Sequence, residues 1–302
     1  MVSLSKEYLD LKFDFMFKQL FGQPSRKHIT IAFLNDLLGR KDENRITDLT
    51  FENTEYIKET EDGKTVRLDF AVLTSAGENI NVEVQVTNQH NMQERTLYYW
   101  AKMFFNTVYS GQSYVLAKPT IMISILNYPL FPSETDSFHT IFHIKEDTEH
   151  FVWSNHLEFH VFDLSTFMVQ WKKYRRKMKA LEKCEELPWL MMLSAADYQE
   201  KKWDEEIMSE LEEWALNKEQ VREALIEWET LSTNKENRKL YEARKKELMD
   251  LLSNLEGAQR LGEERGKKEV ATKMHEKGYD ISTIAEITGF SEQEIQRLII
   301  QN

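Results

Sequence analysis

The spacing of hydrophobic and polar positions divides the chain into an N-terminal half of mixed helices and strands and a helical C-terminal half. Apolar residues recur every three or four positions in the predicted helices and every second position in the predicted strands that have one buried face. The predicted helices of the N-terminal half are 6–21, 26–39 and 91–109, and the predicted strands are 48–57, 66–74, 80–87, 120–127, 138–145 and 157–163. A helix between the third and fourth strands indicates a crossover connection, and so an α/β fold with a mixed central sheet flanked by helices.

Two neighbouring strands of this set carry carboxylates on one face. In the second strand Val82, Val84 and Val86 alternate with Asn81, Glu83 and Gln85, and in the first strand Leu68 and Phe70 alternate with Arg67 and Asp69. If the apolar positions face the core, Asp69 and Glu83 lie on the same polar side, with Gln85 beside them. Two carboxylates on rigid strands can bind Mg²⁺ for phosphodiester chemistry. The competing interpretation is a solvated outer face, where acidic residues are common.

The predicted helix that follows these strands adds cation and phenol donors. Arg95, Tyr98, Tyr99 and Lys102 are spaced by three, four and seven positions, so they share one helix face. Donors of this kind beside two carboxylates suit an anionic substrate that a metal ion bridges.

Four blocks of sequence, taken in order, resemble a known family. They are an opening helix LKFDFMFKQLFG from Leu11, the Asp69…Glu83-x-Gln85 strands followed by ERTLYYW from Glu94, the stretch GQSY with KPTIMISILNY from Gly111, and the tail GYDISTIAEITGFS from Gly278. This order is similar to that of the Rpn-type recombination-promoting nucleases, which are also described as transposases and belong to the PD-(D/E)XK nuclease superfamily. The resemblance covers nearly the whole chain and is strongest over residues 8–165.

The resemblance implies a site and a cofactor. Asp69, Glu83 and the carbonyl of Val84 would be ligands of Mg²⁺ or Mn²⁺, and Gln85 stands where the wider superfamily usually has Lys. A neutral amide can orient the attacking water only through hydrogen bonds, so activation would fall mainly on the metal.

The residues implied beyond the metal ligands are less specific. Lys102 could supply a displaced cation, with a solvated helix residue as the competing interpretation. Arg95, Tyr98 and Tyr99 would bind substrate, and Asp14 of the first helix is a weaker candidate.

Composition bounds the class of protein. The 302 residues are 41% hydrophobic and contain one cysteine, Cys184, which excludes a disulfide framework and a cysteine-based zinc site. We find no apolar segment long enough to cross a membrane and no signal sequence, so a cytoplasmic protein without membrane association is expected.

Charge argues against attraction of DNA to the molecule as a whole, because the net charge is −12. Residues 171–183 carry seven basic residues and one acid, a net of +6, and are a candidate phosphate contact. Residues 200–229 carry eleven acids and four basic residues, a net of −7, so pairing of the two segments is an equal alternative.

The C-terminal half reads as helices at 165–184, 203–230 and 235–277, with Pro188 as a break and Gly257, Gly262 and Gly266 weakening the last. Residues 270–277, 281–288 and 292–299 have the spacing of a small helix-turn-helix with a capping box from Ser291 to Glu294. Acidic residues in its last helix favour packing or oligomerisation over DNA reading. The expected domains are 1–165, a PD-(D/E)XK-like nuclease core; 166–256, a helical extension; and 257–302, a charged helical tail.

The resulting prediction is a metal-dependent DNA endonuclease that acts in recombination, mobile DNA or phage defence. A homodimer would suit cleavage of both strands. The alternatives are a catalytically degenerate nuclease fold that binds proteins as an assembly module, and a transposase, which would also require strand transfer.

Overall fold

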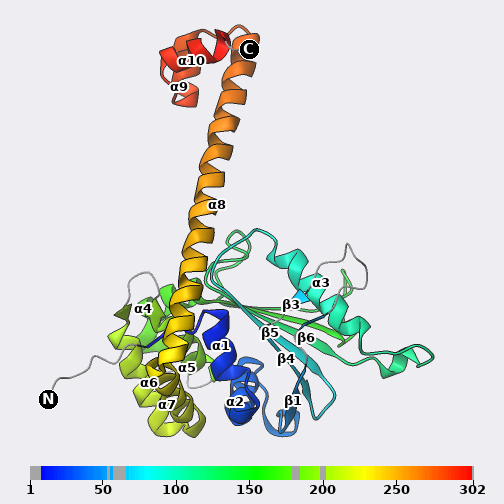
Figure 1. The fold of residues 1–302 in the computed structure, drawn as a ribbon. Helices are drawn as coiled ribbons and strands as arrows, with labels where there is room; N and C mark the ends of the chain where they lie inside the picture. The colour runs from blue at the N-terminus through cyan, green and yellow to red at the C-terminus, as the bar shows by residue number, and fades with distance from the viewer. Residues whose placement is uncertain are drawn as a thin grey trace, which may run out of the picture. The chain divides into compact units, whose positions relative to one another are not determined.

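The structure is a computed structural model that describes residues 8–52, 55–56, 66–67, 69–178, 184–197 and 202–300. It divides into two compact units, Met1–Arg244 and Lys245–Asn302. The first unit holds the sheet and the helices around it (Figure 1). The helices between residues 164 and 233 belong to the same unit as the sheet, and the domain boundaries after residues 165 and 256 stay predictions.

A six-stranded sheet with the order β1-β4-β5-β6-β8-β7 forms the centre of the first unit. Strands β5, β6 and β8 are parallel to one another, while β1, β4 and β7 pair antiparallel with their neighbours. The six strands are β1 (Leu49–Phe51), β4 (Phe70–Thr74), β5 (Asn79–Gln85), β6 (Thr120–Leu126), β7 (His139–Phe142) and β8 (Leu157–Asp163). The predicted mixed sheet is therefore confirmed. Two short pairs lie outside it, β2 (Glu55–Tyr56) with β3 (Val66–Arg67) and β9 (Ala196–Asp197) with β10 (Lys202–Trp203).

The helices of the first unit mostly follow the predicted segments. They are α1 (Asp14–Phe21), α2 (Lys27–Leu37), α3 (Met92–Phe105), α4 (Leu164–Met178), α5 (Leu187–Ser194), α6 (Glu205–Asn217) and α7 (Glu219–Thr233), with the 3₁₀ turns η1 (Pro24–Arg26), η2 (Asp42–Asn44) and η3 (Tyr114–Leu116). One predicted helix over 203–230 is wrong, because the chain breaks at Lys218, which has extended backbone angles, and forms α6 and α7. Pro188 lies in the first turn of α5, one residue after its start at Leu187, where its missing N–H is tolerated.

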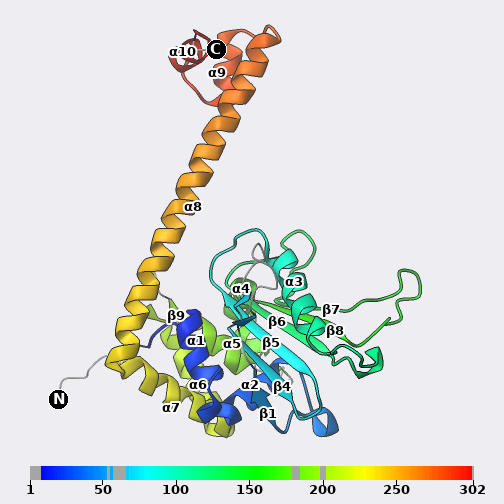
Figure 2. The ribbon, with the colours of Figure 1, turned by 45° about the vertical axis from the view of Figure 1, so that its right-hand side comes forward.

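Helices cover both faces of the sheet. On one face α3 packs over Ala71 and Met122 through Met103. On the opposite face the ring of Phe17 from α1 stacks on Phe70, at 5.6 Å between centroids. Figure 2 shows α3 and α1 on the two sides of the strands.

The central strands are consequently buried on both faces. All seven residues of β6 are buried, as the absence of alternation predicted. In β5 the polar residues Asn81 and Glu83 are buried as well, and Glu83 is only 2% exposed. The solvated-face interpretation of Glu83 is therefore wrong, because α3 covers the face that carries it.

Helices α5 to α7 close the core beside α1 and α2. Trp189 of α5 packs edge-on against Phe33, with its indole N–H donating to Asp36 Oδ2 at 2.7 Å. Trp228 of α7 is fully buried and donates to the carbonyl of Leu9 at 2.8 Å. These contacts join the two halves of the sequence in one core.

The second unit contains most of α8 (Lys235–Glu276), followed by α9 (Ile281–Thr288) and α10 (Glu292–Ile300). Ala271, Ile284 and Ile295 form its small core. The predicted capping box is present, since Ser291 N donates to Glu294 Oε2 at 2.8 Å and Glu294 N donates to Ser291 Oγ at 3.3 Å. The glycines of α8 do not interrupt it, so the expected weakening does not end the helix.

Two further predictions concern the basic segment and membrane-spanning helices. The side chains of residues 174–183, most of the predicted basic segment, lie outside the described residues. No helix in the described ranges is both long enough and apolar enough to span a membrane.

Candidate active site

Asp69 is fixed to β5 at the point where β4 and β5 stop pairing. The last paired residues are Phe70 and Val82. Two residues beyond Val82, the backbone N–H of Val84 donates to Asp69 Oδ2 at 2.7 Å. The carboxylate thus continues the contact between the two strands beyond their last described pair, and Asp69 comes opposite Glu83 when the register is extended by one residue.

The carbonyl of Val84 faces the same side as its N–H. In a strand, the N–H and C=O of one residue point to the same neighbour, and successive residues alternate. The carbonyl of Gln85 accepts from Asn127 N at 2.9 Å, on the β6 side. The carbonyl of Val84 therefore points to the side of Asp69.

Glu83 occupies a dry position with one oxygen engaged and one without a partner. Its Oε2 accepts from Arg95 Nη2 at 2.9 Å. Its Oε1 is buried and has no hydrogen-bond partner among the described residues. Such an oxygen is costly in a folded protein unless an ion or a water molecule satisfies it.

Arg95 is held in place by its own helix. Its Nε donates to the hydroxyl of Tyr99 at 3.1 Å, one turn later on α3, and the guanidinium lies 5.2 Å from the centre of the Tyr99 ring. Burial lowers the pKa of Arg95, but Glu83, Tyr99 and Asp69 together outweigh this effect and raise the pKa overall. Arg95 is therefore a permanent charge aimed at the carboxylates.

Burial perturbs both carboxyl groups in the same direction. It raises the pKa of Asp69 to about 6, against the lowering effect of the Val84 N–H. It raises the pKa of Glu83 to about 8, against the lowering effect of Arg95, while the charge of Asp69 adds to the rise. Perturbed carboxyl pairs of this kind are enriched at functional sites.

Helix α1 contributes the charge of Asp14, which the sequence named as a weaker candidate, and that of Lys18, to which it gave no role at the site. The carboxylate of Asp14 raises the pKa of Asp69, which supports its proximity to the pair. Lys18, one turn later, lowers the pKa of both Asp69 and Glu83. The sequence itself offers only the spacing of four between Asp14 and Lys18, which on a helix surface favours an ion pair between them.

The remaining predicted residues lie further along the same elements, on α3 beyond Arg95 and on β5 beyond Glu83. Tyr98 is exposed on the outer side of α3, although Tyr99 faces Arg95. Lys102 is partly buried two turns beyond Arg95, about 10 Å further along the axis. Gln85 is partly buried at the end of β5. The structure therefore joins Asp69, Glu83, Val84, Arg95 and Tyr99 by contacts or register. The roles of these five residues stay predictions, as do those of Tyr98, Lys102 and Gln85.

Comparison with known families agrees with this geometry. A family model described as "PD-(D/E)XK nuclease family transposase" matches residues 11–258, which is more than half of the chain. The chain belongs to this family. No curated protein and no solved structure matches the chain.

Membership in the PD-(D/E)XK nuclease family transposases confirms the predicted fold class and supports a nuclease type of function acting on nucleic acid. The match ends at residue 258, so α9 and α10 lie outside the part that the family model describes. The expected relation to the Rpn group within this family stays a prediction.

Nucleases of the PD-(D/E)XK type use divalent metals, and the donors present fit such an ion. Within the described ranges, no three His, Cys, Asp or Glu side chains converge as a metal cluster. Two carboxylates and a backbone carbonyl remain, and Mg²⁺ commonly takes one or two protein carboxylates together with water and phosphate oxygens. The partnerless Oε1 of Glu83 is the observation that fits this ion best.

Asn81 is a further polar residue on the face of Glu83 that the sequence placed there without assigning it a role. It is completely buried between Ala71 and Met122 of the adjacent strands. Neither its side-chain oxygen nor its nitrogen has a partner among the described residues. Polar burial on this face therefore extends beyond the carboxylate pair.

Proposed function

We propose that this protein is a metal-dependent DNA endonuclease that hydrolyses phosphodiester bonds. The observation that carries the proposal is that Asp69 is bonded to the backbone N–H of Val84, next to Glu83, while Arg95 is bonded to Glu83. Dry carboxylates with raised pKa values and a fixed cation suit a site that gives up the contact between Glu83 and Arg95, together with a proton, for a metal ion and a phosphate.

Each residue has a distinct task in this proposal. Asp69 and Glu83, with the carbonyl of Val84, would hold Mg²⁺ or Mn²⁺. Arg95 offsets the negative charge of the scissile phosphate, for which a guanidinium is well suited. Gln85 orients the attacking water through its amide. When bound, the metal supplies an activated water and neutralises charge on the phosphate.

Lys18 is the better placed of the two lysines for electrostatic support, because its charge acts on both carboxylates. Lys102 lies two turns along α3 from Arg95 and is better placed to contact the substrate strand beyond the scissile bond. The distinction matters because Gln85 supplies no charge at the position where a lysine is usual.

Cleavage of supercoiled plasmid DNA in the presence of Mg²⁺ or Mn²⁺ tests the proposal. We expect nicking or linearisation by the wild type and a loss of at least a hundredfold in Asp69→Asn and Glu83→Gln, since both variants keep the shape of the side chain. Glu134→Gln, at an exposed position in the loop before β7, is the matched control and should cleave like the wild type.

Equal cleavage by wild type, Asp69→Asn and Glu83→Gln would refute the assigned site. Absence of cleavage by all of them favours the second candidate function, a degenerate nuclease fold that binds another protein. The neutral Gln85 and the lack of a third converging carboxylate in the described ranges support that candidate. Titration with Mn²⁺ separates the two, because a degenerate site has no need to bind the ion.

Several finer properties belong to the same proposal. A two-fold homodimer suits cleavage of both strands. Action in the cytoplasm, on recombining, mobile or phage DNA, suits a nuclease of this family. Transposase activity would require joining of strands, which an assay for strand transfer products detects separately from plasmid cleavage.

A further inference from the structure

The segment that begins at Arg95 is free of acidic residues. Residues 95–133 contain no Asp or Glu, although 51 of the 302 residues of the chain are acidic. About one residue in six would be acidic at that average, so the gap is long. The same segment contains Arg95, Lys102 and Lys118, which gives it a net charge of +3 in a chain of net charge −12.

Aromatic side chains project to solvent from this segment. On the outer side of α3, Tyr98 is 40% exposed and Phe105 is 68% exposed. In the loop that follows, Tyr109 is 71% exposed and Tyr114 is 88% exposed. Isolated exposed apolar residues are ordinary, but a row of rings on one stretch marks an interaction site.

Local hydrogen bonds support this loop. The N–H of Tyr109 donates to Gln112 Oε1 at 3.0 Å, and the N–H of Gln112 donates back to the carbonyl of Tyr109 at 3.0 Å. Gly111 lies between them with a positive φ of 84°, a conformation that favours glycine. The exposed rings therefore extend from a bonded turn.

The row of rings is continuous with the candidate active site. Tyr98 is the neighbour of Tyr99, whose hydroxyl bonds to Arg95, and the two tyrosine rings are 6.4 Å apart. Phe105 follows Tyr98 by two helical turns, about 10 Å, which equals about three base steps at 3.4 Å. Lys102 lies between them in sequence.

We propose that Tyr98, Phe105, Tyr109 and Tyr114 form a stacking surface for the unpaired bases of a single-stranded DNA segment next to the scissile bond. Exposed rings interspersed with cations are the features that bind single-stranded nucleic acid without sequence preference. The proposal names the substrate form of the function proposed above, and it rests on that function only for the position of the scissile bond.

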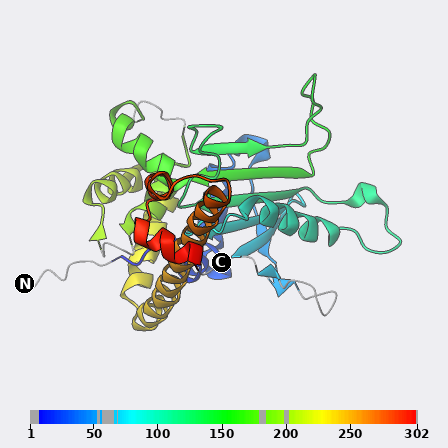
Figure 3. The same cartoon turned by 90° about the horizontal axis from the view of Figure 1, so that it is seen from above.

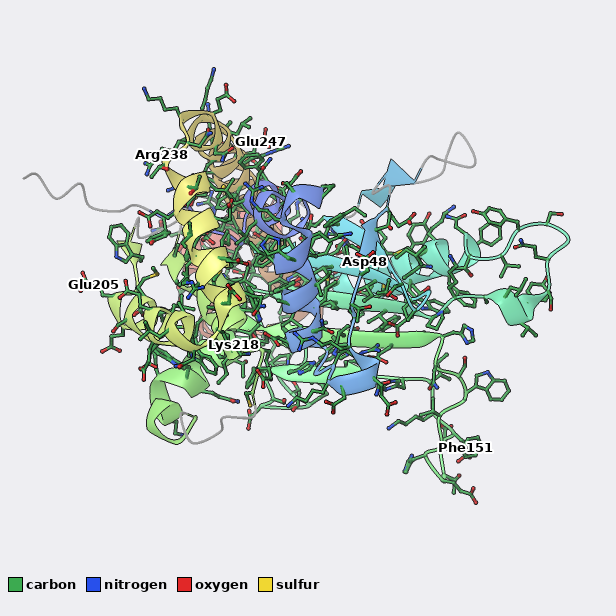
Figure 4. All side chains as sticks on the ribbon, turned by 90° about the horizontal axis from the view of Figure 1, so that it is seen from below. Asp48, Phe151, Glu205, Lys218, Arg238 and Glu247 are labelled. Carbon is green, nitrogen blue, oxygen red and sulfur yellow. The ribbon has the colours of Figure 1, made fainter. Side chains whose placement is uncertain are left out.

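A second group of exposed aromatic residues differs in charge from the proposed stacking surface, and this difference is why nucleic acid is proposed only for the stacking surface. The hairpin that follows β7 exposes Phe151 and Trp153, and Phe151 projects away from the sheet (Figure 4). Both the hairpin and the loop after α3 extend beyond the strands (Figure 3). The hairpin carries three acids, Glu146, Asp147 and Glu149, so it repels a polyanion, and it provides a matched control.

Fluorescence anisotropy with labelled oligothymidylate and with a duplex of equal length tests the proposal. All measurements contain chelator and no divalent metal, so that binding is read without cleavage. We expect wild type to prefer the single strand, and the triple variant Phe105→Ala, Tyr109→Ala, Tyr114→Ala to bind it at least tenfold more weakly. The salt dependence should be shallow, with a logarithmic slope of about −2 for three cations.

The control variant Phe151→Ala, Trp153→Ala should bind the oligonucleotide like the wild type. Equal binding by wild type and the triple variant would refute the proposal, as would equal losses in the triple variant and the control. A triple variant that binds DNA normally but changes the oligomeric state in sedimentation would assign the surface to a second copy of the chain instead.

The nuclease proposal and the stacking surface can be refuted separately, because the plasmid assay and the binding assay measure different properties. If the wild type does not cleave but the triple variant alone loses single-strand binding, the stacking surface stands and the nuclease proposal falls. If the wild type cleaves while oligothymidylate binding does not depend on the rings, the stacking surface falls and the nuclease proposal stands.

Discussion

Replacing Glu83 by Gln should make the metal-free protein more stable at alkaline pH, although it removes a candidate metal ligand. The reason is the raised pKa of this carboxyl group. In the folded protein burial raises the pKa of Glu83 to about 8 from its ordinary value of 4.5. Between these values the folded chain keeps a proton on Glu83 that the unfolded chain has lost.

The sign and the size follow from proton linkage. Because the folded state binds more protons, the free energy of unfolding falls as pH rises, by about 1.4 kcal/mol per pH unit for one proton. From about pH 5.5 to pH 8 the loss in wild type amounts to roughly 3 kcal/mol as an upper limit. Asp69, whose pKa rises to about 6, adds a contribution of the same sign that ends near that pH.

The assay is urea unfolding of the metal-free protein, followed by circular dichroism across this pH range, for wild type and Glu83→Gln. Above about pH 6, where Asp69 has already titrated, the free energy of unfolding of the variant should fall much less with pH than that of wild type. Mg²⁺ at about a hundred times its dissociation constant should restore about 2.7 kcal/mol to wild type at pH 8 and much less to the variant. Identical pH slopes in the two proteins would refute the burial argument for Glu83.

Three further substitutions test the remaining contacts of the site. Arg95→Met leaves the Glu83 carboxylate without its cation, so urea unfolding should show a loss of up to about 3–5 kcal/mol at alkaline pH and less at acidic pH; a loss that is equal at both would contradict the ion pair. Lys18→Met should reduce plasmid nicking at least tenfold and Lys102→Met less, and the reverse order would show that Lys102 is the active lysine. Asn81→Leu removes a buried amide that has no partner among the described residues, so the free energy of unfolding in urea should stay level or rise. A fall of more than about 1 kcal/mol would reveal a partner.

The sequence predicted the sheet because its signals are local. Alternation in β5 and the unbroken apolar run in β6 are read within single strands, and the helix between them requires a parallel crossover. The carboxylate pair followed from the same alternation, since register in a strand fixes which side chains share a face. The structure places Asp69 and Glu83 side by side, as that reasoning requires.

The burial of Glu83 beneath α3 could not be predicted from local patterns. Whether Glu83 faces water or a helix depends on where α3 packs, and α3 has polar and apolar residues on both sides. Its inner side presents Met103 to the sheet while its outer side exposes Phe105. The buried residues Met92, Thr96 and Met103 share one face of α3, but one of them is polar and Phe105 is apolar on the other side. The sequence therefore does not show which side of α3 covers Glu83, and the raised pKa of Glu83 could not be anticipated.

Contacts between distant segments were also beyond local patterns. Lys18 acts on a carboxylate far along the chain, and nothing in its own helix indicates this. The break between α6 and α7 occurs at Lys218 without Gly or Pro, where the side chain bonds to Asp36 of α2 at 3.3 Å. Tertiary contacts thus override the helical period at this position.

The neutral Gln85 acquires a physical meaning from the arrangement of cations around the pair. The positive charge comes from α3 through Arg95 and from α1 through Lys18, rather than from β5 itself. A guanidinium stays protonated over the whole accessible pH range, so Arg95 can neutralise charge but cannot exchange a proton with water. Proton-linked behaviour near neutral pH at this site is therefore left to Asp69 and Glu83, whose pKa values burial has moved to about 6 and about 8.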